Sequence, residues 1–171
     1  MIVLGIDPGL ASTGYGVVAT GGSGSAGGGL AALDGGVIRT PGDRAHERRL
    51  AEIHGAVAAL LDKHGPGAVA LEELYFGQNA RTAFAVGQAR GVVMLAAGQR
   101  GIPCTSYTPQ QVKGAVCGSG RADKEQVARM VKALLGLAAE PRSDHMADAL
   151  AVAICHANRA PLSAALAGAG V

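Results

Sequence analysis

Aromatic and cysteine side chains are scarce in this chain of 171 residues. There is no Trp, and Phe and Tyr together make up 3% of the sequence. The three cysteines, Cys104, Cys117 and Cys155, form no C-x-x-C pair and are odd in number, so neither a zinc knuckle nor a disulfide framework is indicated. Because nothing in this pattern requires an oxidising compartment, we expect a cytoplasmic protein.

Apolar runs long enough to span a bilayer are also missing. The first run, residues 2–6, is cut by Asp7 and lacks the basic leader of a targeting segment. The longest later run, residues 83–97, contains Gln88 and Arg90. With 49% hydrophobic and 16% charged residues, the chain can still bury a core, and its length fits one domain.

Glycine is abundant, with 27 residues, but it follows no Gly-X-Y period, so a collagen-like chain is excluded. Charge is unevenly distributed along the sequence. Residues 1–76 hold five basic and eight acidic side chains, whereas residues 77–171 hold ten basic and five acidic ones. The basic half favours an anionic partner, although a chance excess of solvated Arg and Lys explains it equally well.

Hydrophobic periodicity predicts one α/β domain over residues 1–157 and a tail over 158–171 in which we expect partial disorder. Strands are expected at 2–6, 13–19, 30–39, 68–73 and 103–108, and helices at 44–64, 81–100, 123–135 and 143–157. Three strands close in sequence predict an antiparallel meander, and strands separated by helices predict parallel crossovers. The expected fold is therefore a five-stranded mixed sheet with helices on both faces.

Asp7 lies where the first strand ends in a glycine-rich turn. The carboxyl ends of strands are where open α/β sheets place their sites, so Asp7 is a candidate functional residue. An ordinary turn is the alternative, because the carboxylate of Asp-Pro-Gly often caps its own backbone.

Glu72 and Glu73 end the expected strand at 68–73. Alternation along a strand sends their side chains to opposite faces, so only one of them can join Asp7. A carboxylate at the end of a buried strand is costly unless it is paired or binds a cation. One of the two is therefore a candidate ligand, and the other is a solvated charge.

Three further candidates begin the expected helix at 143–157. Asp148 shares a helix face with both His145 and Asp144, which lie three and four residues earlier. Asp144 has another explanation, because an acid in the first turn after the N-cap Ser143 complements the helix dipole. His145 could equally be a half-exposed side chain, whereas Asp148 is surrounded in sequence by Ala147, Ala149, Leu150 and Ala151 and is harder to explain in that way.

Asp7, Glu72 and Asp148, with a nearby His, form an oxygen-rich set that suits hard divalent cations better than structural zinc. Carboxylates from separate elements that hold two such ions let nucleases activate water and stabilise the leaving oxygen. The set favours a metal-dependent nuclease.

Five strings, in order and with compatible spacing over residues 2–157, resemble the RuvC family of bacterial Holliday-junction resolvases. They are GIDPG at 5–9, TGYG at 13–16, LEE at 71–73, GQARG at 87–91 and ADALA at 147–151. The resemblance implies a ribonuclease H-like fold, a homodimer, and symmetrical nicking of four-way DNA junctions that leaves 5′-phosphate and 3′-hydroxyl ends. It also implies the RuvA and RuvB branch-migration proteins as partners.

For the active site, the resemblance implies two Mg²⁺ ions held by Asp7, Glu72 and Asp148, with Mn²⁺ able to substitute. The fourth position, three residues before the last Asp, is often Asp in this family and is His145 here. Asp144 lies one residue too early to fill it. We expect His145 to be the fourth ligand and to shift the preference towards Mn²⁺, because imidazole binds Mn²⁺ better than Mg²⁺.

For DNA binding, the resemblance places the aromatic that enters the junction centre at Tyr75, with Phe76 beside it. Aromatics on a loop next to the site can stack on unpaired bases, although a staple that folds the loop onto the core is the alternative. Lys113 and Lys124 match basic positions of the family, and Arg121 lies in the same Gly-rich stretch. We expect these three cations to contact phosphates.

Small residues recur at four-residue spacing on the expected second helix, at Ala83, Gly87, Gly91 and, further along, Gly98. Such a stripe permits close approach by another backbone. Both the sheet of the same chain and a dimer mate fit this stripe.

Three other functions are compatible with parts of this pattern. A nuclease acting on RNA–DNA hybrids uses the same fold and metal cluster. An actin-like ATP-binding module also places an Asp-Gly turn after a strand, but it needs two such domains, which 171 residues scarcely allow. A catalytically silent junction-binding protein is disfavoured by the complete set of acids.

Overall fold

The computed structural model describes residues 1–21, 29–73 and 80–168. Its strands are β1 (Ile2–Asp7), β2 (Ser12–Thr20), β3 (Leu30–Arg39), β4 (Ala68–Glu72) and β5 (Cys104–Tyr107). Its helices are α1 (His46–His64), α2 (Ala80–Gly98), α3 (Pro109–Cys117), α4 (Lys124–Leu135) and α5 (Asp144–Gly168). No helix within the described ranges is long and apolar enough to cross a membrane.

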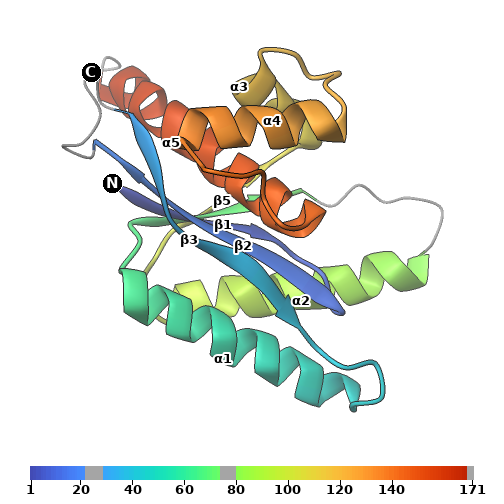
Figure 1. Cartoon of the computed structure of the whole chain (residues 1–171). Coiled ribbons are helices and arrows are strands. Elements are labelled where there is room, and N and C mark those ends of the chain that lie inside the picture. Colours follow the sequence, from blue (N-terminus) through green and yellow to red (C-terminus); the bar gives the residue numbers. More distant parts are fainter. Residues whose placement is uncertain (22–28, 74–79, 169–171) are drawn as a thin grey trace.

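The strands form one mixed sheet in the order β3-β2-β1-β4-β5. The pairs β1–β2 and β2–β3 are antiparallel, whereas β4 pairs with β1 and with β5 in parallel. Figure 1 shows α1 and α2 on one face of this sheet and α3, α4 and α5 on the other. The predicted meander with parallel additions, and helices on both faces, is therefore confirmed.

Two helical segments differ from the prediction. Helix α3 was not expected, although its capping box was present in the sequence: the Thr108 hydroxyl accepts from the Gln111 backbone N–H, and the Gln111 side chain accepts from that of Thr108. Helix α5 continues to Gly168, so it runs beyond the expected end at residue 157 into the tail over 158–171. The domain boundary at 157 stays a prediction.

Residues along β1 alternate between two cores. Val3 packs in the core beneath α5, whereas Leu4 and Ile6 pack in the core against α1 and α2. Asp7 continues the alternation on the α5 side of the sheet, and Glu72 does the same at the end of β4, one residue after Leu71 in the other core. Strand periodicity therefore brings both acids to the same face.

Glycine in β1 and β2 lets α5 lie directly on the sheet. A Cβ at Gly5 would come within 2.1 Å of the Ala149 carbonyl oxygen, and one at Gly14 within 1.9 Å of the His145 carbonyl oxygen. Any larger residue at these positions would push the helix away. The two glycines thus place the first turns of α5, with His145 and Asp148, beside the end of β1.

Candidate active site

Asp7 and His145 meet at the carboxyl end of β1. The Nδ1 atom of His145 lies 2.7 Å from Oδ2 of Asp7, so the ring N–H donates to the carboxylate. In this tautomer the remaining ring nitrogen, Nε2, carries the lone pair that can bind a cation. The turn after Asp7 is held by Thr13, whose hydroxyl donates to the Gly9 carbonyl over 2.6 Å.

Glu72 and Asp148 lie together in a hollow of about 290 Å³ on the α5 side of the sheet. Glu73 is exposed, and its backbone N–H donates to the Tyr107 carbonyl at the end of β5. Strand alternation thus separates the two neighbouring acids as predicted, and Glu72 is the one that faces Asp148. The Ser143 hydroxyl accepts from the Met146 N–H, which confirms the expected N-cap of α5.

The acids of this region repel one another. Burial, and then the charges of Asp148 and Asp7, raise the pKa of Glu72 to about 7. Burial and the charge of Asp7 also raise the pKa of Asp148. The mutual repulsion of these three carboxylates favours binding of a cation, which would offset it.

Two lysines line the same hollow as Glu72 and Asp148. They are Lys113 on α3 and Lys124 at the start of α4. The pKa of Lys124 is raised, chiefly by the charge of Asp148. Both predicted phosphate-binding lysines are therefore brought to the acids, where they can hold an anionic substrate against them.

Asp144 points to Lys124 rather than to Asp7. Its Oδ2 atom lies 3.3 Å from Nζ of Lys124, and 75% of the side chain is exposed. His145, not Asp144, is the residue of the first turn of α5 that contacts Asp7. Of the two neighbours, His145 is thus the one that lies against Asp7, and its role as the fourth ligand stays a prediction.

The chemistry of these donors suits a divalent cation, but in this structure the side chains lie too far apart to share one. Oxygen ligands and one imidazole are a set that Mg²⁺ and Mn²⁺ accept. Within the described ranges, however, no three His, Cys, Asp or Glu side chains are already close enough to hold a metal ion. Binding of a metal ion would therefore require these side chains to move closer together.

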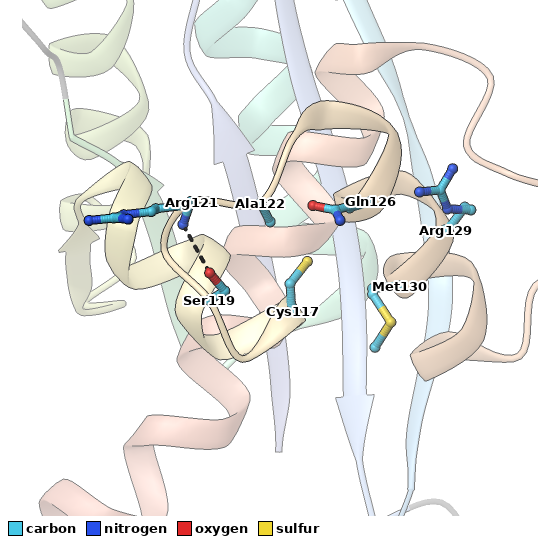
Figure 2. A pocket seen from close by; sticks show the side chains of 7 residues that line it. All are labelled: Cys117, Ser119, Arg121, Ala122, Gln126, Arg129 and Met130. Carbon is cyan, nitrogen blue, oxygen red and sulfur yellow. Dashed lines mark hydrogen bonds between the residues drawn. The ribbon is translucent and has the colours of Figure 1, made fainter.

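Of the other three predicted DNA-binding residues, Tyr75 and Phe76 lie outside the described residues. Arg121 lies on the loop between α3 and α4, where it lines a separate hollow of about 470 Å³ (Figure 2). Its backbone N–H donates to the Ser119 hydroxyl, and its side chain extends away from Arg129, at the other side of that hollow (Figure 2).

Arg90 supports the site from the opposite face of the sheet and was not singled out as a candidate from the sequence. Its guanidinium, on α2, donates to the Glu72 carbonyl over 2.8 Å and to the Ser106 hydroxyl on β5. It therefore fixes the end of the strand that carries Glu72. The signal was the one charged residue inside the long run 83–97, in which Gln88 is the other polar side chain.

Comparisons with known proteins agree on one family. The family described as "Crossover junction endodeoxyribonuclease RuvC" matches residues 3–156. A protein of that name from Moorella thermoacetica is 53% identical over 161 residues, which cover 94% of this chain and 93% of the relative.

Solved structures agree with that match. The RuvC structure of Thermus thermophilus has a TM-score of 0.87 and 42% identity, and the alignment covers 95% of this chain and 97% of that one. T. thermophilus RuvC in complex with a Holliday junction substrate has a TM-score of 0.85 and 40% identity, covering 95% and 96%. The expected ribonuclease H-like fold is thereby confirmed.

Proposed function

This chain belongs to the RuvC family of crossover junction endodeoxyribonucleases, and from that premise we propose how its residues resolve a Holliday junction. It is an endonuclease of DNA recombination and repair whose substrate is the four-way junction. The observation that carries the proposed site is the hollow in which Glu72 and Asp148 lie with Lys113 and Lys124. Neither an RNA–DNA hybrid nuclease nor an ATP-binding module is needed to explain it.

Asp7, Glu72, Asp148 and His145 would hold the metal ions, and we take Mg²⁺ as the ion, with two per site and Mn²⁺ able to substitute. When bound, the ions activate the attacking water and stabilise the leaving oxygen. Such hydrolysis leaves 5′-phosphate and 3′-hydroxyl ends.

Lys113 and Lys124 hold the scissile phosphate beside the acids through charge-assisted hydrogen bonds. His145 orients Asp7 through Nδ1 and offers Nε2 as a ligand. Arg90 keeps the end of β4, and so Glu72, in place. Arg121 contacts the backbone of a DNA arm farther from the cut, and Tyr75 with Phe76 stacks on bases at the junction centre.

Paired nicks require two active sites, so the working enzyme is a homodimer. The exposed face of α2 suits the contact with the second copy. Met94 and Leu95 are 44% and 55% exposed there, and a Cβ added at Gly91 or Gly98 would meet no atom within 4 Å. Glycines Gly91 and Gly98 of the stripe therefore leave room for the partner helix rather than for the sheet.

Family membership alone carries two further assignments. RuvA and RuvB are the branch-migration partners that bring the junction to the enzyme. The cytoplasm is the compartment, in agreement with three cysteines that are all unpaired.

The test is cleavage of a labelled synthetic four-way junction by Asp7→Asn, Glu72→Gln and Asp148→Asn. Losing even an outer partner of a metal ligand typically costs about 10- to 100-fold, so we expect each variant to cut more than about 100-fold more slowly. Junction binding without metal should persist, since the shape of each side chain is kept. A variant that cuts at nearly the parental rate would remove its residue from the site.

The same assay with Mg²⁺ and Mn²⁺ tests His145. We expect the parent to prefer Mn²⁺ and His145→Asp to prefer Mg²⁺, because a carboxylate is the harder ligand. Unchanged activity and ion preference in His145→Ala would show that His145 is not a ligand.

A further inference from the structure

A groove lies between the N-terminal ends of α1 and α2. It is on the face of the sheet opposite to the one that carries Lys113 and Lys124. It consists of two adjoining hollows of about 470 and 480 Å³ that share Leu10, Arg49 and Ala85. We call it the α1–α2 groove. His145 lines one end, and Phe84, which is 71% exposed, lines the other.

Arg49 is held in this groove by a chain of hydrogen bonds. Its Nε donates to the Thr40 hydroxyl over 2.9 Å, and that hydroxyl donates to the Leu10 carbonyl over 2.5 Å. Thr40 is 5% exposed, so the middle of this chain of hydrogen bonds is buried. Within the described residues, the two terminal nitrogens of Arg49 have no hydrogen-bond partner, and they form the fork that matches a phosphate.

The charge of the groove fits an anion. Its described lining contains Arg49, His46 and His145 and no acid. The rest of the lining is largely apolar, with Leu10 and Phe84 offering surface for a base or sugar. His46 Nε2 lies 2.7 Å from Oε1 of Gln88, and this contact joins the two helices that form the walls.

The position of the groove identifies which anion it meets. Figure 1 shows the N-terminal ends of α1 and α2 on the side of the molecule where β1 ends. His145 contacts Asp7 and also lines the groove, so the groove opens directly beside the acids. A DNA strand lying across Asp7, with Lys113 and Lys124 on one face of the sheet, would therefore meet Arg49 on the other.

We infer that the α1–α2 groove binds the nucleotide next to the scissile phosphate, with its own phosphate on Arg49 and its base or sugar against Leu10 and Phe84. This inference rests on the proposed function, because it takes the acids as the point of cleavage. It assigns a binding role to Arg49 and gives the enzyme a subsite on each face of the sheet edge.

The test pairs a protein variant with a change in the DNA. Single neutral methylphosphonate linkages are placed in turn along the cleaved strand of a synthetic junction, and affinity is measured in EDTA. We expect one linkage beside the cut to weaken binding by the parent about tenfold, the worth of a charge-assisted hydrogen bond. Arg49→Gln, which can still bond to Thr40, should bind unmodified junction about tenfold more weakly and lose that penalty.

Arg100→Gln is the matched control. Arg100 follows the C-terminal end of α2, away from the groove, and its Nε lies 2.7 Å from Oδ1 of Asp62 on α1. Arg100→Gln should bind the unmodified junction as tightly as the parent and show the same loss of affinity at each methylphosphonate linkage. If Arg49→Gln keeps the parental penalty at every linkage, the groove does not hold that phosphate. Should Arg49→Gln not fold, Arg49→Met keeps the aliphatic stem without the charge, and an unchanged penalty in that variant also overturns the inference.

Binding in EDTA separates this inference from the proposed function. If Asp7→Asn still cuts while Arg49→Gln no longer loses affinity at the modified linkage, the binding role of the groove is supported and the assignment of the acids is wrong. If Asp7→Asn is inactive and the penalty is unchanged, the acids stand and the groove assignment fails.

Discussion

The carboxyl group of Glu72 is the clearest case of one residue whose chemistry the fold has changed. Its pKa is raised to about 7, first by burial and then by the charges of Asp148 and Asp7. The folded protein without metal therefore favours the protonated form, whereas the unfolded chain ionises at its usual, lower pH. The resulting stability is complete in acid and is lost as pH rises from about 4.5 to about 7.

We predict that Glu72→Gln stabilises the metal-free protein at pH 8, because the amide carries no charge to bury. The gain should be about 2 kcal/mol, which corresponds to a melting temperature about 4 to 8 °C higher for a chain of this size. This gain in stability should decrease as the pH is lowered towards about 4.5, the ordinary pKa of a Glu side chain. Thermal melts in EDTA across this pH range measure it.

Glu73→Gln is the control for that prediction, since Glu73 is the exposed neighbour. Its stability should stay within about 0.5 kcal/mol of the parent at every pH. Added Mg²⁺ should narrow the difference between Glu72→Gln and the parent. A Glu72→Gln gain that does not depend on pH would mean that charge burial is not its cause.

Helix α5 is the element on which the site depends most. It carries His145 and Asp148, and its backbone comes directly against β1 at Gly5 and against β2 at Gly14. The sheet contributes Asp7 and Glu72, so the spacing between helix and sheet sets the spacing of the acids. Small residues in two strands thus determine the geometry of the chemistry.

We predict that Gly14→Ala destabilises the protein by about 2 kcal/mol, within the range for an overpacked core. The new methyl group would lie 1.9 Å from the His145 carbonyl oxygen and displace the first turn of α5. Cutting of a junction should fall at least about tenfold, since a displacement of about 1 Å can cost 100-fold. Binding in EDTA should change little.

Gly55→Ala on α1 is the matched control, because its added Cβ meets no atom within 4 Å. It should stabilise the helix by about 0.5 to 1 kcal/mol and leave cutting unchanged. Parental cutting by Gly14→Ala would show that the approach of α5 does not control the acids.

At the scale of the whole molecule, the two faces of the sheet have different roles. The face with α3, α4 and α5 presents the acids and lysines, and the face with α1 and α2 supports Glu72 through Arg90 and leaves an exposed apolar surface on α2. A junction with two equivalent strands to cut matches a dimer joined through that surface.

We predict that Leu95→Glu converts a dimer into monomers, because the dimer would bury a charge at the contact. Sedimentation of the parent should give a dimer, and that of Leu95→Glu a monomer that no longer cuts both strands together. Leu134→Glu, at an exposed site on α4, should remain a dimer. A monomeric parent, or a dimeric Leu95→Glu, would rule out this interface.

Much of the fold was determined by local sequence patterns. Alternating and helical periodicity predicts the five strands and four of the five helices in the described part of the chain, and the alternation at 72–73 correctly separates Glu72 from Glu73. These features depend on neighbours a few residues apart, which is why one sequence suffices to find them. Helix α3 is not predicted by periodicity because, with nine residues, it is too short to show a clear helical pattern.

Only the tertiary structure decided which distant residues meet. His145 and Asp7 are 138 residues apart, and their contact requires α5 to rest on glycines in two strands. Arg90 and Arg49 acquire their roles only when a helix packs under the sheet and brings a guanidinium to the Glu72 carbonyl or to Thr40. Local propensity determines the elements of this protein, whereas side-chain packing between them determines which charges converge on the site.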